Sequence, residues 1–200
     1  MAIKVGITGG IGSGKSFISR IFEALSIPTY DADKQAKELM NSDPEIREKL
    51  IAAFGANTYN TLGVLDRSYL SEVVFKDGEK LKKLNDIVHP IVINHGNRWG
   101  DEQKGPYSLK EAALLFESGS YKNLDYTILV TSPLELRIKR VMERDHTSRE
   151  QVESRISKQM SDQEKIPLAD IVIINDEQTP LLPQIMDIHN LLLSKAESHA

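Results

Sequence analysis

The sequence predicts a three-layer α/β fold with a five-stranded parallel sheet. Three observations support this prediction. Five short apolar runs recur along the chain, helical patterns separate most of them, and the first two runs enclose a glycine-rich loop that leads into a helix. Strand, loop, helix and strand in that order form a βαβ unit.

The βαβ unit occupies the first part of the chain. Ile3 to Ile7 is a short, mostly apolar run of the kind found in strands buried on both faces of a sheet. After the glycines, apolar residues recur at helical spacing from about Lys15 to Leu25, which predicts an amphipathic helix. Ile27 to Asp31 then predicts the second strand, with Pro28 near its start.

Strand signals nearly vanish from Asp33 to about Lys104. Two helical stripes in this stretch are Ile46, Leu50, Ala53 and Phe54, and Leu81, Leu84, Ile87, Val88 and Ile91. We therefore expect a helical lobe at residues 34–104, inserted into a nucleotide-binding core made of residues 1–33 and 105–200.

The last part of the chain returns to the core. Strand-like runs are Leu109 to Phe116, Tyr126 to Val130 and Ile171 to Ile174. Leu134 to Met142 and Pro180 to Leu193 predict helices. The first of the three strand-like runs also suits a helix, because it contains Lys110, Glu111 and two alanines.

Composition narrows the classes of function. The chain has 200 residues, 40% of them hydrophobic and 27% charged, with a net charge of −4 and no cysteine. No global basic field is available for nucleic acid, and neither disulfides nor thiolate metal sites are possible. The N-terminus lacks a signal-peptide pattern, and no apolar run is long enough to span a membrane. We expect a cytoplasmic protein, a monomer or weak homo-oligomer, with no nucleic-acid or membrane partner.

Gly9 to Ser16 carry the strongest functional signal. Their sequence, Gly-Gly-Ile-Gly-Ser-Gly-Lys-Ser, fits the phosphate-loop pattern G-x-x-x-x-G-K-[ST] without a mismatch. Glycines allow backbone conformations in which successive N–H groups face one anion, and the following helix adds the positive end of its dipole. Lys15 is expected to reach the β- and γ-phosphates, and the Ser16 hydroxyl to ligate Mg²⁺.

A phosphate loop alone does not separate a kinase from a nucleotide switch. Guanine-nucleotide switches carry D-x-x-G and N-K-x-D after this loop, and the sequence contains neither pattern. The absence favours ATP chemistry on a second substrate. Two rival interpretations stay open: another small-molecule kinase of the same fold, acting on a nucleoside monophosphate or a sugar acid, and a nucleotide-binding regulatory module without an acceptor.

Carboxylates follow two of the predicted strands. Asp31 and Asp33 are expected at the carboxyl edge of the sheet, where ligands bind in open α/β folds. A kinase that phosphorylates an alcohol needs a carboxylate to accept or orient the hydroxyl proton. Asp33 is the candidate base, with Asp31 as electrostatic support, and Asp33 also suits a helix N-cap. Glu117 ends the third apolar run and either orients the substrate or metal shell, or is a solvated residue at a helix start.

The stretch from Arg144 to Lys165 is polar and charged, and predicts a mobile helical lid at about residues 144–165. Arginines in and before it are Arg137, Arg140, Arg144, Arg149 and Arg155. A phosphoryl group in transfer spreads charge over its equatorial oxygens, which guanidinium groups on a closing lid stabilise. We expect Arg140 or Arg144 to reach ATP; for any single arginine, the alternative is a solvated ion pair with a nearby acidic residue.

Two further polar residues have open roles. His89 precedes Pro90 after an apolar run, and a lone histidine is more often structural than catalytic. Asn175 follows the last strand and either caps the next helix or contacts the adenine edge of the nucleotide.

Taken together, these motifs resemble the dephospho-coenzyme A kinase family, and the resemblance spans nearly the whole chain. The segments that carry it are Gly6–Ser16, Asp31–Asp33, Leu65–Arg67, Leu84–Ile91, Leu114–Glu117, Arg140–Asp145, Arg155, Gln159, Ala169–Asp170 and Asn175–Asp176. Two positions depart from the family: Ala113 stands where a proline is usual, and Arg137 where a glutamine is common.

The resemblance implies transfer of phosphate from ATP to the ribose 3′-hydroxyl of dephospho-coenzyme A, the last step of coenzyme A biosynthesis. It implies that Asp33 is the base, that the helical lobe holds the coenzyme with His89 near its entrance, and that Asn175 lies by the adenine. The residues expected in the site are Asp33, Lys15, Arg140 and Arg144 for catalysis; Ile11, Gly12, Ser13, Gly14, Lys15, Ser16 and Asn175 for ATP; Asp31, Asp33, His89 and Glu117 for the acceptor; and Ser16 for Mg²⁺.

Overall fold

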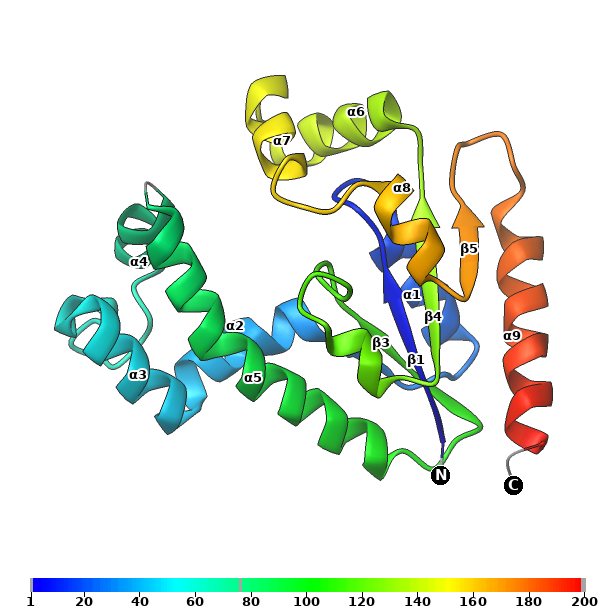
Figure 1. The fold of residues 1–200 in the computed structure, drawn as a ribbon, viewed down its shortest axis with the longest axis horizontal. Coiled ribbons are helices and arrows are strands. Elements are labelled where there is room, and N and C mark those ends of the chain that lie inside the picture. Colours follow the sequence, from blue (N-terminus) through cyan, green and yellow to red (C-terminus); the bar gives the residue numbers. More distant parts are fainter. Residues whose placement is uncertain (1, 76, 199–200) are drawn as a thin grey trace. The chain divides into compact units, whose positions relative to one another are not determined.

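The computed structural model describes residues 2–75 and 77–198 (Figure 1). These residues form two compact units. The first unit extends to Asp31 and resumes at Trp99, and the second is Ala32–Arg98. Within the described ranges, no helix is both long enough and apolar enough to cross a membrane.

The first unit is built on a five-stranded parallel sheet, which confirms the predicted fold class. The strands are β1 (Ile3–Thr8), β2 (Thr29–Asp31), β3 (Tyr107–Glu111), β4 (Tyr126–Thr131) and β5 (Ile171–Ile174). Their order across the sheet is β2-β3-β1-β4-β5, and every neighbouring pair is parallel. All five carboxyl ends therefore lie at one edge, toward the region of α6 and α7 in Figure 1.

Helices and turns cover both faces of this sheet. The helical elements of the first unit are α1 (Lys15–Ala24), η2 (Ser120–Asn123), α6 (Leu134–Asp145), α7 (Arg149–Ile156), α8 (Asp162–Lys165), η3 (Ile166–Leu168) and α9 (Leu181–Glu197). Ile18 of α1, Ile185 of α9 and Val5 of β1 belong to one buried core on the first face. On the opposite face, Leu115 packs against Gly6, since a Cβ added at that glycine would lie 2.7 Å from the leucine side chain.

The second unit is helical, in agreement with the patterns read from the sequence. Its elements are α2 (Ala32–Ser42), α3 (Pro44–Phe54), η1 (Ala56–Thr58), α4 (Arg67–Phe75) and most of α5 (Gly78–Glu102). Asp43 caps α3 by accepting from the Ile46 N–H, and the stripe residues Ile46 and Leu50 are completely buried. The division into a nucleotide core and a coenzyme lobe stays a prediction about where each substrate binds.

The third strand ends earlier than the sequence predicts. The apolar run Leu109 to Phe116 predicts a strand of that length, but β3 ends at Glu111, and residues 113–119 form turns. The apolar run continues past the strand because Leu115 is fully buried within those turns. Hydrophobicity alone does not show where such a strand stops. The carboxylate at the end of β3 is therefore that of Glu111, and not that of Glu117.

Candidate active site

The glycine-rich loop connects β1 to α1. Gly12 and Gly14 have φ angles of 80° and 93°, in the left-handed region that glycine adopts without strain. Because α1 begins at Lys15, the N–H groups of Lys15 and Ser16 have no partner within the helix, whereas those of Phe17 and Ile18 donate to the Gly14 carbonyl. The N–H groups of Lys15 and Ser16 and the positive end of the helix dipole give the loop the geometry of an anion site.

Lys15 and Ser16 lie beside Glu111. The Ser16 hydroxyl donates to Glu111 Oε1 at 2.5 Å, and Lys15 Nζ lies 3.7 Å from the same oxygen. The Glu111 side chain is only 7% exposed. The sheet register pairs Glu111 with Ile7 of β1 and with Asp31 of β2. An amine, a hydroxyl and two acidic residues thus gather where three neighbouring strands end.

Glu111 is a site residue that the sequence reasoning missed. A strand extended to Phe116 places Glu111 in mid-strand and draws attention to Glu117 instead. Glu111 could have been identified as a carboxylate inside an apolar run. Such a residue is expected to be buried, and a buried carboxylate needs a hydrogen-bonding or charged partner. Lys15 and Ser16 supply that partner.

Asn175 contacts the phosphate loop directly. Its Nδ2 donates to the Ser13 carbonyl at 2.8 Å, and a Cβ added at Gly14 would lie 2.3 Å from that nitrogen. Arg140 of α6 donates to the Asn175 carbonyl at 3.3 Å and to Glu177 Oε1 at 3.0 Å. The loop, Asn175 and Arg140 are therefore connected in series by hydrogen bonds.

Arg144 belongs to a separate and exposed group of ion pairs. Its side chain is 62% exposed and bonds Asp145 at 2.7 Å, and Asp145 also accepts from Arg155 at 2.8 Å. The Arg144 hydrogen bond, helped by Arg155, lowers the pKa of Asp145 to about 2. Of the two arginines expected at ATP, the structure brings Arg140 into contact with a residue that bonds the loop.

Glu117 contacts the predicted lid. Its Oε1 accepts from the Met160 N–H at 3.0 Å and lies 3.0 Å from Lys165 Nζ. Lys165 is completely buried, and an ammonium group at that depth needs a counter-charge. Glu117 therefore ties residues 160–165 to the turns that follow β3. Its role in binding the acceptor stays a prediction.

Asp33 and His89 lie in the second unit. Asp33 is in the first turn of α2, two residues after the end of β2, and His89 is in α5. Burial lowers the pKa of His89, while the charges of Asp33 and Asp86 oppose that shift. The predicted base and the predicted acceptor-binding histidine thus interact electrostatically. Their roles in the reaction stay predictions.

The acidic and hydroxyl groups of the site suit magnesium. Among the described residues, no three His, Asp or Glu side chains come together as a metal site. Mg²⁺ in phosphoryl-transfer enzymes is usually bound by one or two protein oxygens, water and substrate phosphates. The adjoining oxygens of Ser16 and Glu111 match that requirement.

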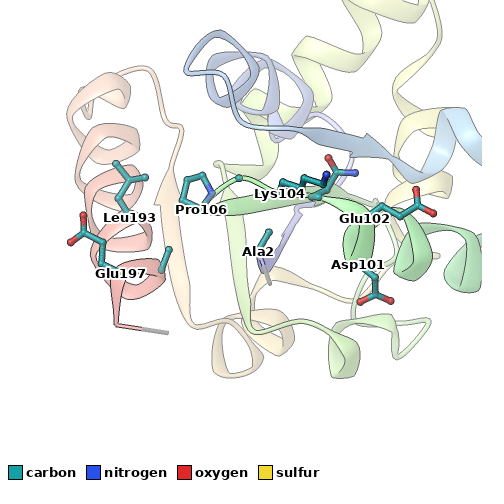
Figure 2. A pocket seen from close by; sticks show the side chains of 10 residues that line it. Ala2, Asp101, Glu102, Lys104, Pro106, Leu193 and Glu197 are labelled. Carbon is teal, nitrogen blue, oxygen red and sulfur yellow. The ribbon is translucent and has the colours of Figure 1, made fainter. Parts of the chain in front are cut away.

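A pocket at the other end of the sheet does not belong to this site (Figure 2). It has a volume of about 1000 Å³, and Ala2, Pro106 and Leu193 are among the residues that line it. Ala2 and Pro106 immediately precede β1 and β3, so the pocket lies at the amino ends of the strands. Ligands of open α/β sheets bind at the carboxyl ends, where the glycine-rich loop lies.

Comparisons with known proteins point to one family. The family model described as dephospho-CoA kinase matches residues 3–180. A dephospho-CoA kinase of Bacteroides fragilis is 40% identical over 196 residues, which cover 98% of this chain and 95% of the relative. A solved Thermus thermophilus protein shares 35% identity with a TM-score of 0.81 over 97% of each chain. The solved dephospho-CoA kinase from Campylobacter jejuni shares 28% identity with a TM-score of 0.69 over 100% of each chain.

Proposed function

The chain belongs to the dephospho-CoA kinase family of transferases, and we propose that it phosphorylates the ribose 3′-hydroxyl of dephospho-CoA with ATP, giving coenzyme A in the final step of its biosynthesis. One structural observation supports this proposal most directly. The amine of Lys15 and the hydroxyl of Ser16 meet the buried carboxylate of Glu111 at the carboxyl edge of the sheet. That arrangement suits a nucleotide triphosphate with its metal.

ATP binds with its phosphates in the loop formed by Ile11 to Ser16. The N–H groups of Lys15 and Ser16 at the start of α1 donate to the phosphate oxygens, and the ammonium of Lys15 neutralises charge on the β- and γ-phosphates. Asn175 lies by the adenine, and its bond to Ser13 holds the loop and the base-binding segment together. Arg140, with Arg144 as the second candidate, stabilises the charge on the transferred phosphoryl group.

Ser16, by its hydroxyl, and Glu111, by its carboxylate, would hold Mg²⁺. The metal supplies positive charge to the β- and γ-phosphates when it is bound. Support comes from the shared hydrogen bond, which already sets the two oxygen ligands side by side. Glu111 also keeps Lys15 near the loop, since the two charges are 3.7 Å apart.

The acceptor occupies the helical lobe at residues 34–104, and His89 of that lobe and Asp31 at the end of β2 are among the residues that bind it. Asp33 takes the proton of the 3′-hydroxyl while the 3′-oxygen attacks the γ-phosphorus. The bond from the γ-phosphorus to the β–γ bridging oxygen breaks, and ADP leaves. Asp33 follows the end of β2 by two residues, which supports this role because β2 adjoins the strand that carries Glu111.

We also propose a cytoplasmic location and action as a monomer or weak homo-oligomer. A net charge of −4 supports the absence of a nucleic-acid partner.

A steady-state assay of ADP release tests the function. ADP should form at a rate that rises and saturates with dephospho-CoA, and AMP, CMP, UMP or shikimate should not replace it. Turnover with a nucleoside monophosphate but not with dephospho-CoA would assign the protein to another branch of small-molecule kinases. Tight ATP binding without any acceptor-dependent ADP release would indicate a regulatory module.

A further inference from the structure

Ile11, at the tip of the phosphate loop, is held on three sides by the predicted lid and the helix before it. Its N–H donates to Gln159 Oε1 at 2.9 Å, and its carbonyl accepts from Arg137 Nε at 3.0 Å. Its side chain packs against a buried cluster of α6 and α7 that includes Val141 and Val152. The G-x-x-x-x-G-K-[ST] pattern accepts any residue at this position, so the pattern does not account for these contacts.

Arg137, which makes one of these contacts, is a buried arginine. The residue is 6% exposed, and its Nη1 lies 3.2 Å from Asp162 Oδ1 in the first turn of α8. A buried guanidinium needs acceptors for its fork of N–H groups, and here Asp162 and the Ile11 carbonyl supply them. These two interactions hold the guanidinium between the phosphate loop and α8.

Gly10 gives independent support. Its φ angle is not in the left-handed region, so its backbone does not require glycine. A Cβ added there would lie 2.0 Å from Arg137 Nη2 and 2.5 Å from Arg137 Cζ, both far inside van der Waals contact. Gly12 is also close, since its Cβ would lie 2.5 Å from the Arg137 carbonyl. The absence of a side chain at Gly10 is therefore explained by the guanidinium that occupies that space.

We propose that Arg137 and Gln159 are positioning residues that fix the two peptide groups flanking Ile11 and thereby couple the lid to the phosphate loop. Fixing these two peptide groups keeps the loop N–H groups aimed at the ATP phosphates. The coupling is reciprocal: whatever loosens the lid contacts weakens ATP binding, and bound ATP stabilises the lid contacts. The inference rests on the proposed function only for the identity of the nucleotide.

The test measures ATP affinity without an acceptor, by calorimetry in the presence of Mg²⁺. Arg137→Ala and Gln159→Ala should each raise the Kd for ATP by about tenfold, the loss expected for one hydrogen bond that orients a charged ligand. Arg149→Ala is the matched control, because Arg149 lies in the same region but bonds only the exposed Glu135 and Glu153 among the described residues. It should leave the Kd unchanged.

A double-mutant cycle separates positioning from a general loss of structure. Gly10→Ala should weaken ATP binding in the wild type, because the new methyl group collides with Arg137, and should change the Kd little when Arg137 is already alanine. In the steady-state assay, the KM for ATP should rise while the KM for dephospho-CoA stays within about twofold.

Two results would overturn the inference. One is a Kd for ATP in Arg137→Ala and Gln159→Ala equal to that of Arg149→Ala. The other is a Gly10→Ala penalty of the same size in both backgrounds. Neither result depends on which acceptor is phosphorylated, so failure of this inference is distinguishable from failure of the proposed function. If Arg137→Ala does not fold, Gln159→Ala alone decides, because it removes only the acceptor of the Ile11 N–H.

Discussion

Replacing Lys110 by methionine should stabilise the protein by about 3 kcal/mol at pH 7. Lys110 lies in β3 with only 5% of its surface exposed, and its ammonium nitrogen has no hydrogen-bond partner among the described residues. Burial lowers its pKa from 10.5 to about 8. Since each pKa unit is worth about 1.4 kcal/mol, keeping the charged form buried costs about 3 kcal/mol at neutral pH.

The free energy of unfolding should depend on pH because of the shifted pKa of Lys110. The folded pKa lies below the unfolded one, so between pH 8 and 10.5 the unfolded state binds more protons than the folded state. Stability of the wild type should therefore rise with pH across that window. The advantage of Lys110→Met should be full below pH 8 and should shrink as the pH approaches 10.5.

Urea unfolding at pH 7 and at pH 10 measures both quantities. Lys122→Met is the control, because Lys122 is exposed in η2 and should change stability little at either pH. A Lys110→Met protein no more stable than the wild type at pH 7 would show that burial of the Lys110 ammonium carries no such cost. A stability difference that is the same at both pH values would show that its titration does not contribute.

Three other substitutions test separate parts of the site. Glu111→Gln should lower kcat by about 100-fold at saturating ATP and Mg²⁺, because the carboxylate that orients Ser16 is lost; near-normal turnover would remove Glu111 from the site. Asp33→Asn should lower kcat by about 100-fold or more while the KM for ATP changes little; an unchanged kcat would leave Asp33 only a favourable interaction with the dipole of α2, because it lies in the first turn of that helix and not at the predicted N-cap. Glu117→Gln should destabilise the protein by about 3 kcal/mol in urea unfolding, because it leaves the buried ammonium of Lys165 without its counter-charge; an unchanged unfolding midpoint would show that the pair is not stabilising.

Local patterns were sufficient for much of the fold. The glycine loop between an apolar run and an amphipathic stripe predicted β1 and α1, and helical spacing predicted that Ile46 and Leu50 would be buried. Each of these features depends on residues close together in the chain. The end of β3 was not predictable in the same way, because Leu115 is as fully buried in a turn as it would be in a strand.

The missing parts of the site depend on contacts between distant residues. Glu111 meets Ser16 across 95 residues, and Arg137 meets Ile11 across 126. The first contact requires β3 to lie between β2 and β1, an order that the strand sequence along the chain does not reveal. The second places a guanidinium beside Gly10, where the motif itself leaves the residue type open. Motifs identified the chemistry, whereas the tertiary structure identified the residues that position it.

The product formed from dephospho-CoA identifies the reaction that this protein catalyses. The protein is incubated with ATP, Mg²⁺ and dephospho-CoA, and the product is examined by mass spectrometry and by ³¹P NMR. We expect one added phosphate on the ribose 3′-oxygen, one ADP for each coenzyme A formed, and no product with Lys15→Ala. If the protein is fully folded and binds ATP, and the dephospho-CoA is nevertheless recovered unmodified, the proposed function is contradicted.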